Sequence, residues 1–294
     1  MRKWWFLLAA LVLWNSVGYA LLGRPTAKAG SPATMQTQAK RIVSMGPNLT
    51  EILYALDLES NIAGVTIDSD YPSDVATKPK VGGFWQPNIE AIIATEPDLV
   101  VTLGFEQQRQ LANRLTRIGC ATLTLDIETI DDLFQGIIAI GQATGANERA
   151  QALVETMCRR METVRRSAVT NTRPKVLWVV QREPLRVAGR ETFANEIIEL
   201  VGGQNAIGPT LHQYPPIGAE QVIASGIDVI IEPTMIAGQE AAQYEQALSY
   251  WAQFANVPAV ANQRIYVVNG DLVSRLGPRL CDGIETVAAC LKGD

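Results

Sequence analysis

Short apolar runs alternate along the chain with segments in which apolar side chains recur at helical spacing. The runs typical of buried strands cover residues 41–45, 62–66, 99–103 and 121–125. Helical spacing covers residues 49–56, 89–95 and 107–118. Because strands that alternate with helices pack as sheets flanked by helical layers, this pattern predicts an α/β fold.

The pattern contains an internal repeat, in which residues 88–101 align with residues 218–231. Both copies predict a short helix, a turn and an apolar strand, and both follow a turn that holds an aromatic residue and proline. The identical pairs are Glu90 and Glu220, Ile93 and Ile223, Ala94 and Ala224, and Asp98 and Asp228. The repeat predicts two similar α/β lobes.

A helical segment separates the two copies and covers residues 131–168, with a break at residues 144–146. We therefore expect an N-terminal lobe over residues 41–145, a single long backbone helix over 147–169 and a C-terminal lobe over 174–292. The alternative is an ordinary packed helix pair inside one larger domain.

The N-terminus has the order of charges and apolar residues that is typical of a secretory signal. Arg2 and Lys3 precede an apolar stretch over residues 4–14, and small residues follow up to two possible cleavage points, after Ala20 or after Ala29. We expect residues 1–29 to be a signal peptide and residues 30–40 a tether. An uncleaved membrane anchor is the less favoured alternative.

Composition and charge exclude several function classes. The 294 residues carry a net charge of −5, which argues against a nucleic-acid binder. His212 is the one histidine, so a multi-histidine zinc site cannot be built, and we expect no resident metal. Phosphate-loop, dinucleotide-binding and zinc-protease motifs are missing, and no nucleophile has a recognisable base. We therefore expect no catalytic residues, and a periplasmic enzyme on an α/β scaffold remains the alternative of another class.

The four cysteines are Cys120, Cys158, Cys281 and Cys290. Export to an oxidising compartment permits disulfides. Cys281 and Cys290 fall on opposite faces of one predicted helix and should not bond each other. The other pairings, and four free thiols, stay open.

Several short motifs, in their order and spacing, resemble the substrate-binding proteins of ABC importers for cobalamin, haem and ferric siderophores. The matching segments are residues 46–51, 69–72, 81–85, the two repeat helices, 202–205 and 277–280. The resemblance covers about residues 41–292. It implies two lobes on one backbone helix with a ligand cleft between them, in a monomeric periplasmic receptor without a cofactor. Such a receptor captures a bulky metal chelate, with cobalamin favoured and a ferric siderophore or haem as the alternative, and delivers it to a permease dimer with its ATPase subunits.

The resemblance assigns Glu90 and Glu220 to permease docking, since one surface glutamate per lobe meets arginines on the two membrane subunits in this family. The repeat supports this assignment, because two equivalent acids suit a partner with two-fold symmetry. The alternative is that each glutamate only complements a helix N-terminus.

The resemblance also places eight residues at the ligand cleft: Pro47, Asp68, Tyr71, Trp85, Arg186, Tyr214, Ser274 and Arg275. The aromatic faces of Trp85 and Tyr214 suit a corrin or porphyrin ring, although packing within their loops is the alternative. Arg186 and Arg275 would favour anionic groups. The chain departs from the family at Ser274, where an acid is usual, at Asp68, where tyrosine is, and at Arg186, where phenylalanine is.

His212 lies two residues before Tyr214 and could reach a haem iron. An exposed loop histidine is the preferred interpretation, because no partner residue is evident.

Overall fold

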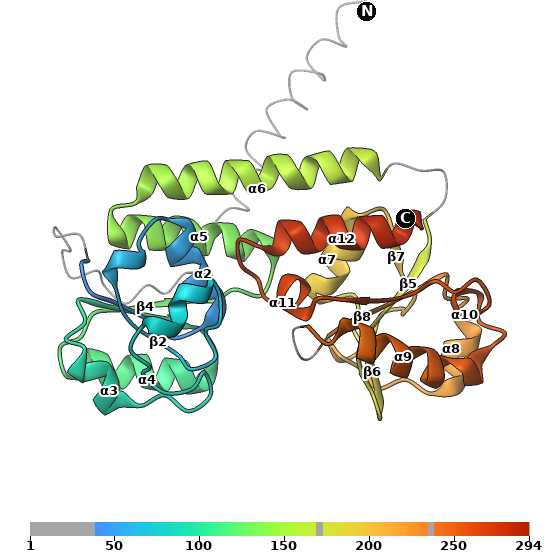
Figure 1. Ribbon diagram of the computed structural model, residues 1–294, viewed down its shortest axis with the longest axis horizontal. Helices are drawn as coiled ribbons and strands as arrows, with labels where there is room; N and C mark the ends of the chain where they lie inside the picture. Colours follow the sequence, from blue (N-terminus) through green and yellow to red (C-terminus); the bar gives the residue numbers. More distant parts are fainter. Residues whose placement is uncertain (1–38, 169–172, 235–237, 294) are drawn as a thin grey trace, which may run out of the picture. The chain divides into compact units, whose positions relative to one another are not determined.

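The computed structural model describes residues 39–168, 173–234 and 238–293. The predicted signal peptide, and the tether up to residue 38, lie outside the described residues. The described chain forms two α/β lobes, each with its own sheet (Figure 1).

The sheet of the N-terminal lobe has four parallel strands in the order β2-β1-β3-β4. They are β1 (Ile42–Ser44), β2 (Ile62–Val65), β3 (Leu99–Leu103) and β4 (Thr122–Leu125). Parallel sheets need cover on both faces, and successive residues of β1 show how this is met. Ile42 packs in the core that also holds α2 (Pro47–Ala55) and α5 (Ile130–Thr144). Val43 packs in the core under α3 (Ile89–Ala94) and α4 (Glu106–Arg117).

The C-terminal lobe repeats this plan around a sheet in the order β6-β5-β8-β9, with β7 paired to β5. Its strands are β5 (Lys175–Arg182), β6 (Leu185–Val187), β7 (Gln204–Asn205), β8 (Val229–Pro233) and β9 (Ile265–Val268). All pair in parallel except β6, which runs antiparallel to β5.

Helices again cover both faces of this second sheet. Those that share the core reaching into the N-terminal lobe are α7 (Phe193–Leu200) and α12 (Leu280–Lys292). Those on the opposite face are α8 (Ala219–Ala224), α9 (Glu240–Trp251) and α10 (Pro258–Ala261). The short helix α11 (Gly270–Val273) follows β9.

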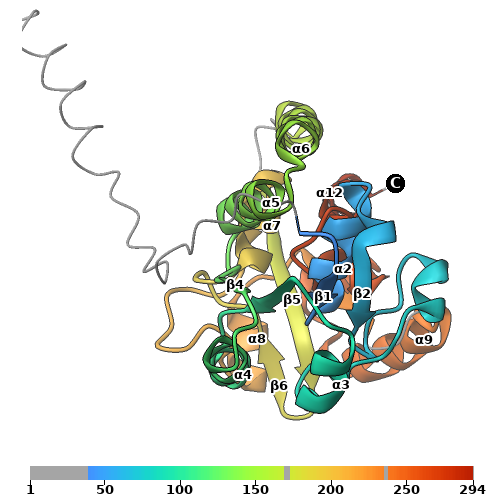
Figure 2. The ribbon, with the colours of Figure 1, turned by 90° about the vertical axis from the view of Figure 1, so that its left-hand side faces the viewer.

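One long helix, α6 (Asn147–Ser167), packs against both lobes (Figures 1 and 2). Gly145 ends the preceding helix α5 in a left-handed conformation with φ of 74°, which favours glycine. The buried face of α6 carries Met157, Met161 and Val164, and these side chains belong to the same core as residues of α5 and α12. A single apolar core therefore runs through both lobes by way of α6.

The sequence repeat is also a structural repeat. Asp98 and Asp228 each precede an inner strand, and each accepts a backbone hydrogen bond from the first strand region of its lobe. The Asp98 carboxylate accepts from the Arg41 N–H at 3.0 Å, and the Asp228 carboxylate accepts from the Lys175 N–H at 2.8 Å. These two identical positions of the repeat are thus explained by strand pairing.

The four cysteines are free thiols, two of them deeply placed in α12. Burial raises the pKa of both Cys281 and Cys290 to about 11, so both stay protonated and unreactive at neutral pH. Across residues 39–168, 173–234 and 238–293, no helix is both long enough and apolar enough to cross a membrane.

We expect Met157→Ala to lower the free energy of unfolding by about 2–5 kcal/mol, because it opens a cavity in the core shared by the two lobes. Urea unfolding followed by circular dichroism measures this. The control is Glu155→Ala on the exposed face of α6, expected to change stability by less than about 0.5 kcal/mol. Two separate unfolding transitions, with only one shifted by Met157→Ala, would contradict a continuous core.

Candidate functional site

Three aromatic side chains form a cluster at the carboxyl end of the N-terminal sheet. We call Phe84, Trp85 and Phe105 the aromatic platform, and each pair of their ring centroids lies 5.0 Å apart. Phe105 lies two residues after the end of β3, and the Phe84 ring packs beside Gly46, two residues after the end of β1. Trp85 is 64% exposed. Ligands of open α/β sheets bind at this edge, where the connections from neighbouring strands diverge, so the platform offers an apolar face at the expected place.

Polar contacts hold the platform against its lobe. The Asp68 carboxylate accepts a hydrogen bond from the Phe84 N–H at 2.5 Å. The buried amide of Gln108 donates to the Met45 carbonyl at 2.6 Å and accepts from the Leu103 N–H at 2.7 Å. The same amide donates to the Phe84 carbonyl at 3.4 Å, so Asp68 and Gln108 both hold the loop of Phe84 and Trp85.

A cluster of five charged side chains connects the two lobes. This interlobe ion cluster consists of Glu51 and Asp70 from the N-terminal lobe and Asp271, Arg275 and Arg279 from the C-terminal lobe. Glu51 is only 4% exposed, and its two carboxylate oxygens accept from the Arg279 guanidinium at 2.6 and 2.9 Å. Arg275 forks onto Asp70 at 2.7 and 3.2 Å, and also pairs with Asp271 at 2.8 Å and with Glu51 at 3.6 Å.

The cluster changes what Arg275 can do. Its guanidinium already faces three carboxylates, and the hydrogen bond from Arg275 lowers the pKa of Asp70 from its ordinary value. Asp70 is therefore ionised throughout the neutral range. From the sequence we expect Arg275 to favour anionic groups of the ligand. In the structure its guanidinium instead pairs with carboxylates of the protein itself.

Tyr71 lies next to this cluster. The Arg279 guanidinium carbon lies 3.9 Å from the centroid of the Tyr71 ring, which is a cation–π contact across the lobes. Pro47 is half-buried at the start of α2, beside Asn48, whose side-chain amide donates to the Leu276 carbonyl at 3.2 Å. These predicted site residues thus lie where the lobes meet.

Two predicted residues of the C-terminal lobe bond to each other. The Arg186 guanidinium on β6 donates to the Tyr214 carbonyl at 3.2 Å, which braces the Tyr214 loop. The Tyr214 ring is partly exposed, and burial raises the pKa of its hydroxyl, so it remains a neutral hydrogen-bond donor. His212 is exposed in the same loop.

Ser274 is exposed, and the acid that accompanies Arg275 on its own segment is Asp271, one helical turn earlier. The sequence analysis missed Asp271, although its spacing of four residues from Arg275 is a helix-pairing signal. It also missed Phe105, Glu51, Asp70 and Arg279. The last three fall inside the short motifs at 46–51, 69–72 and 277–280, so their presence there was a usable signal.

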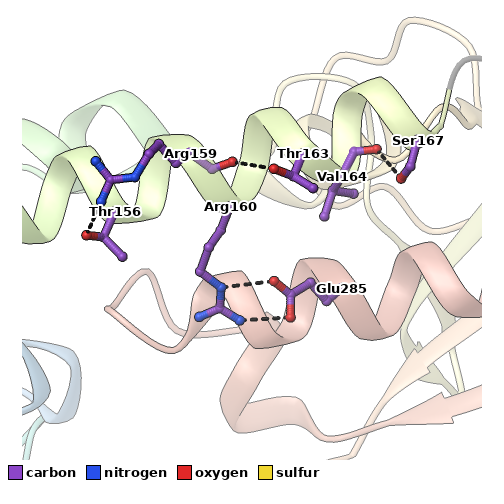
Figure 3. A pocket seen from close by; sticks show the side chains of 7 residues that line it. All are labelled: Thr156, Arg159, Arg160, Thr163, Val164, Ser167 and Glu285. Carbon is purple, nitrogen blue, oxygen red and sulfur yellow. Dashed lines mark hydrogen bonds and ion pairs between the residues drawn. The ribbon is translucent and has the colours of Figure 1, made fainter.

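Two surface hollows lie elsewhere on the described part of the chain. One of about 370 Å³ lies between α6 and α12, where Arg160 forks onto Glu285 at 2.9 and 2.8 Å (Figure 3). Another of about 460 Å³ lies beside Arg182 and Tyr250. Neither is lined by a predicted ligand-binding residue, so the candidate site rests on the platform and its neighbours.

Glu90 and Glu220 occupy the same place in the two lobes. Each is exposed and is the second residue of a six-residue helix, α3 or α8. Both helices lie on the sheet faces opposite α6 (Figure 1). Among the described residues, no group of three or more histidine, cysteine or acidic side chains could hold a metal ion.

Two α/β lobes on a shared helix, with an aromatic surface at a sheet edge, define a substrate-binding protein of the two-lobe type. The profile of the periplasmic binding protein family matches residues 42–272, and the chain belongs to this family.

Relatives of this chain include transport proteins. An uncharacterized ABC transporter substrate-binding lipoprotein of Bacillus subtilis is 29% identical over 268 residues, covering 89% of this chain and 82% of that protein. A vitamin B12-binding protein of Vibrio cholerae is 27% identical over 255 residues, covering 86% of this chain and 90% of that protein. The crystal structure of a possible iron-binding, periplasmic solute-binding protein from Staphylococcus epidermidis matches with a TM-score of 0.74 and 28% identity. That match covers 87% of this chain and 99% of the other.

We expect Arg279→Leu to destabilise the protein by about 3 kcal/mol, because it leaves the buried Glu51 carboxylate without its forked partner. Chemical denaturation at pH 7 measures this. The double variant Glu51→Met/Arg279→Leu should recover most of the loss, since no buried charge is left unpaired. Arg165→Leu, which removes an exposed partner of Glu162, serves as the control and should change little. Equal effects of the Arg279 and Arg165 variants would contradict a role for the ion cluster in stability.

Proposed function

We propose that this protein is the exported receptor of an ABC importer, which captures a bulky metal chelate and delivers it to a membrane permease. The observation that carries the proposal is the aromatic platform, whose most exposed member is Trp85. Membership of the periplasmic binding protein family and relatives described as ABC transporter and vitamin B12-binding proteins support it. The protein binds its ligand without turning it over.

The platform suits a ligand with a large flat apolar ring. Aromatic faces stack on such rings, and the preformed arrangement of Phe84, Trp85 and Phe105 lowers the entropy that binding costs. Tyr214 supplies a second aromatic surface from the other lobe, with a neutral hydroxyl. Corrin and porphyrin chelates have this shape.

The charge of the interlobe ion cluster favours cobalamin among these chelates. Three carboxylates face two guanidinium groups there, so the cluster offers no excess positive charge to haem propionates or an anionic siderophore. The corrin of cobalamin carries uncharged amide side chains, which hydrogen-bond to carboxylates and hydroxyls alike. A ferric siderophore or haem is the second candidate, supported by the exposed Arg186 and by the iron-binding description of one relative.

The receptor acts outside the cytoplasmic membrane. The signal-like segment over residues 1–29 supports export with cleavage after Ala20 or Ala29. The first cysteine of the chain is Cys120, so residues 1–40 offer no thiol for lipid attachment.

Binding is tested by titrating the purified protein with cyanocobalamin, haemin and ferrichrome. We expect the tightest binding for cyanocobalamin, and a loss of about tenfold to a hundredfold in Trp85→Ala, because stacking on an exposed indole contributes about 1.5–3 kcal/mol. Ile118→Ala, at a comparably exposed apolar position that follows α4, is the control and should keep full affinity. Unchanged affinity in Trp85→Ala/Tyr214→Ala removes the proposed ligand site.

Docking is tested with Glu90→Lys/Glu220→Lys. We expect this variant to abolish uptake of ligand by the reconstituted importer while the affinity for ligand stays at the wild-type value, because the two exposed glutamates of α3 and α8 belong neither to the aromatic platform nor to the interlobe ion cluster. Glu155→Lys/Glu199→Lys changes the net charge equally on exposed glutamates of α6 and α7 and should support uptake. A loss of ligand affinity in the first variant would falsify the docking assignment.

A further inference from the structure

Four pairs of identical residues mark the internal repeat, and one pair is a large apolar side chain on the surface. Asp98 and Asp228 are explained by strand pairing. Ile93 and Ile223 are 42% and 61% exposed, in α3 and α8 respectively. They are among the few large apolar side chains that the described residues expose, and folding does not account for them.

The buried faces of the two helices are complete without these isoleucines. Ile92 and Val222, the preceding residues, are fully buried and anchor α3 and α8 on their sheets. A β-branched side chain at an exposed helix position costs helix stability relative to alanine, and here a large part of each isoleucine stays in contact with water. The same residue at the same place in both lobes therefore points to a contact outside the chain.

Each isoleucine lies beside one of the glutamates assigned to docking. Ile93 follows Glu90 by three residues and Ile223 follows Glu220 by three, which places each pair on one helix face. Ala94 and Ala224 are exposed next to them. Each lobe therefore presents a small apolar patch bordered by one negative charge, on a six-residue helix that carries no basic residue.

We propose that Ile93 and Ile223 are the apolar anchors of two equivalent docking patches. Each side chain inserts into an apolar recess beside a basic residue on one of the two membrane subunits of the importer. This inference rests on the proposed function. The partner is fixed by two features: the negative charge at each patch calls for a basic counterpart, and the duplication calls for a partner with two equivalent subunits.

The two residue types of each patch have different effects on binding. Glu90 and Glu220 steer the encounter, so they govern the association rate, and salt screens their effect. Ile93 and Ile223 bury apolar surface only once the complex has formed, so they govern the dissociation rate, and salt does not screen their effect. This difference separates the apolar contact from the ionic one.

The test measures binding kinetics between the receptor and its purified importer in lipid nanodiscs, at low and at high salt. We expect Ile93→Ser and Ile223→Ser each to raise the dissociation rate about tenfold, and the double variant about a hundredfold, with the same factors at both salt concentrations. Binding of cyanocobalamin should stay at the wild-type value. Ile118→Ser is the matched control, because it removes an exposed isoleucine outside the repeat.

Alanine variants at the same two positions keep the test valid if a serine variant folds poorly, since alanine favours the helix.

Wild-type docking kinetics in the double variant, while Glu90→Lys/Glu220→Lys fails to dock, overturn this inference and leave the proposed function in place. An effect at only one of the two positions also overturns it, because the patches would not be equivalent. A wild-type receptor that dimerises through these isoleucines in light scattering assigns the patches to a second copy and overturns it too. A wild-type protein that binds neither the importer nor any of the three chelates removes the proposed function and this inference together.

Discussion

The contact between the two lobes depends on one buried carboxylate, that of Glu51. Glu51 comes from the N-terminal lobe, and the arginines that neutralise it come from the C-terminal lobe. A buried charge without a partner costs several kcal/mol, so the ion pairs favour the one arrangement of the lobes in which Glu51 meets its arginines. Because Arg275 pairs with both Glu51 and Asp70, the same constraint fixes the loop that follows β2.

That loop carries the constraint to the candidate ligand site. Asp68, two residues before Asp70, accepts the hydrogen bond from the Phe84 backbone, and Phe84 packs against Trp85 and Phe105. The interlobe ion cluster and the aromatic platform are thus linked by a few short contacts.

Apolar periodicity was sufficient to predict the layered parts of the fold. The strand at 99–103 and the break between α5 and α6 follow from runs of apolar residues and from Gly145, which are local signals. The site was predicted less completely, because its contacts join residues far apart in the sequence. Glu51 and Arg279 are 228 positions apart, and neither has a local pattern that marks it as half of a buried pair. A similar failure occurs at short range. Comparison with the family places the acidic partner of Arg275 at position 274, which is serine here, whereas the structure pairs Arg275 with Asp271, four residues earlier.

The helix α6 has a consequence for how the ligand leaves. Its 21 residues pack on both lobes within one continuous core, so the lobes cannot swing apart without exposing apolar side chains to water. The proposed ligand can therefore leave by hinge opening only at the free-energy cost of exposing this apolar surface, a cost that flexible linkers would not impose.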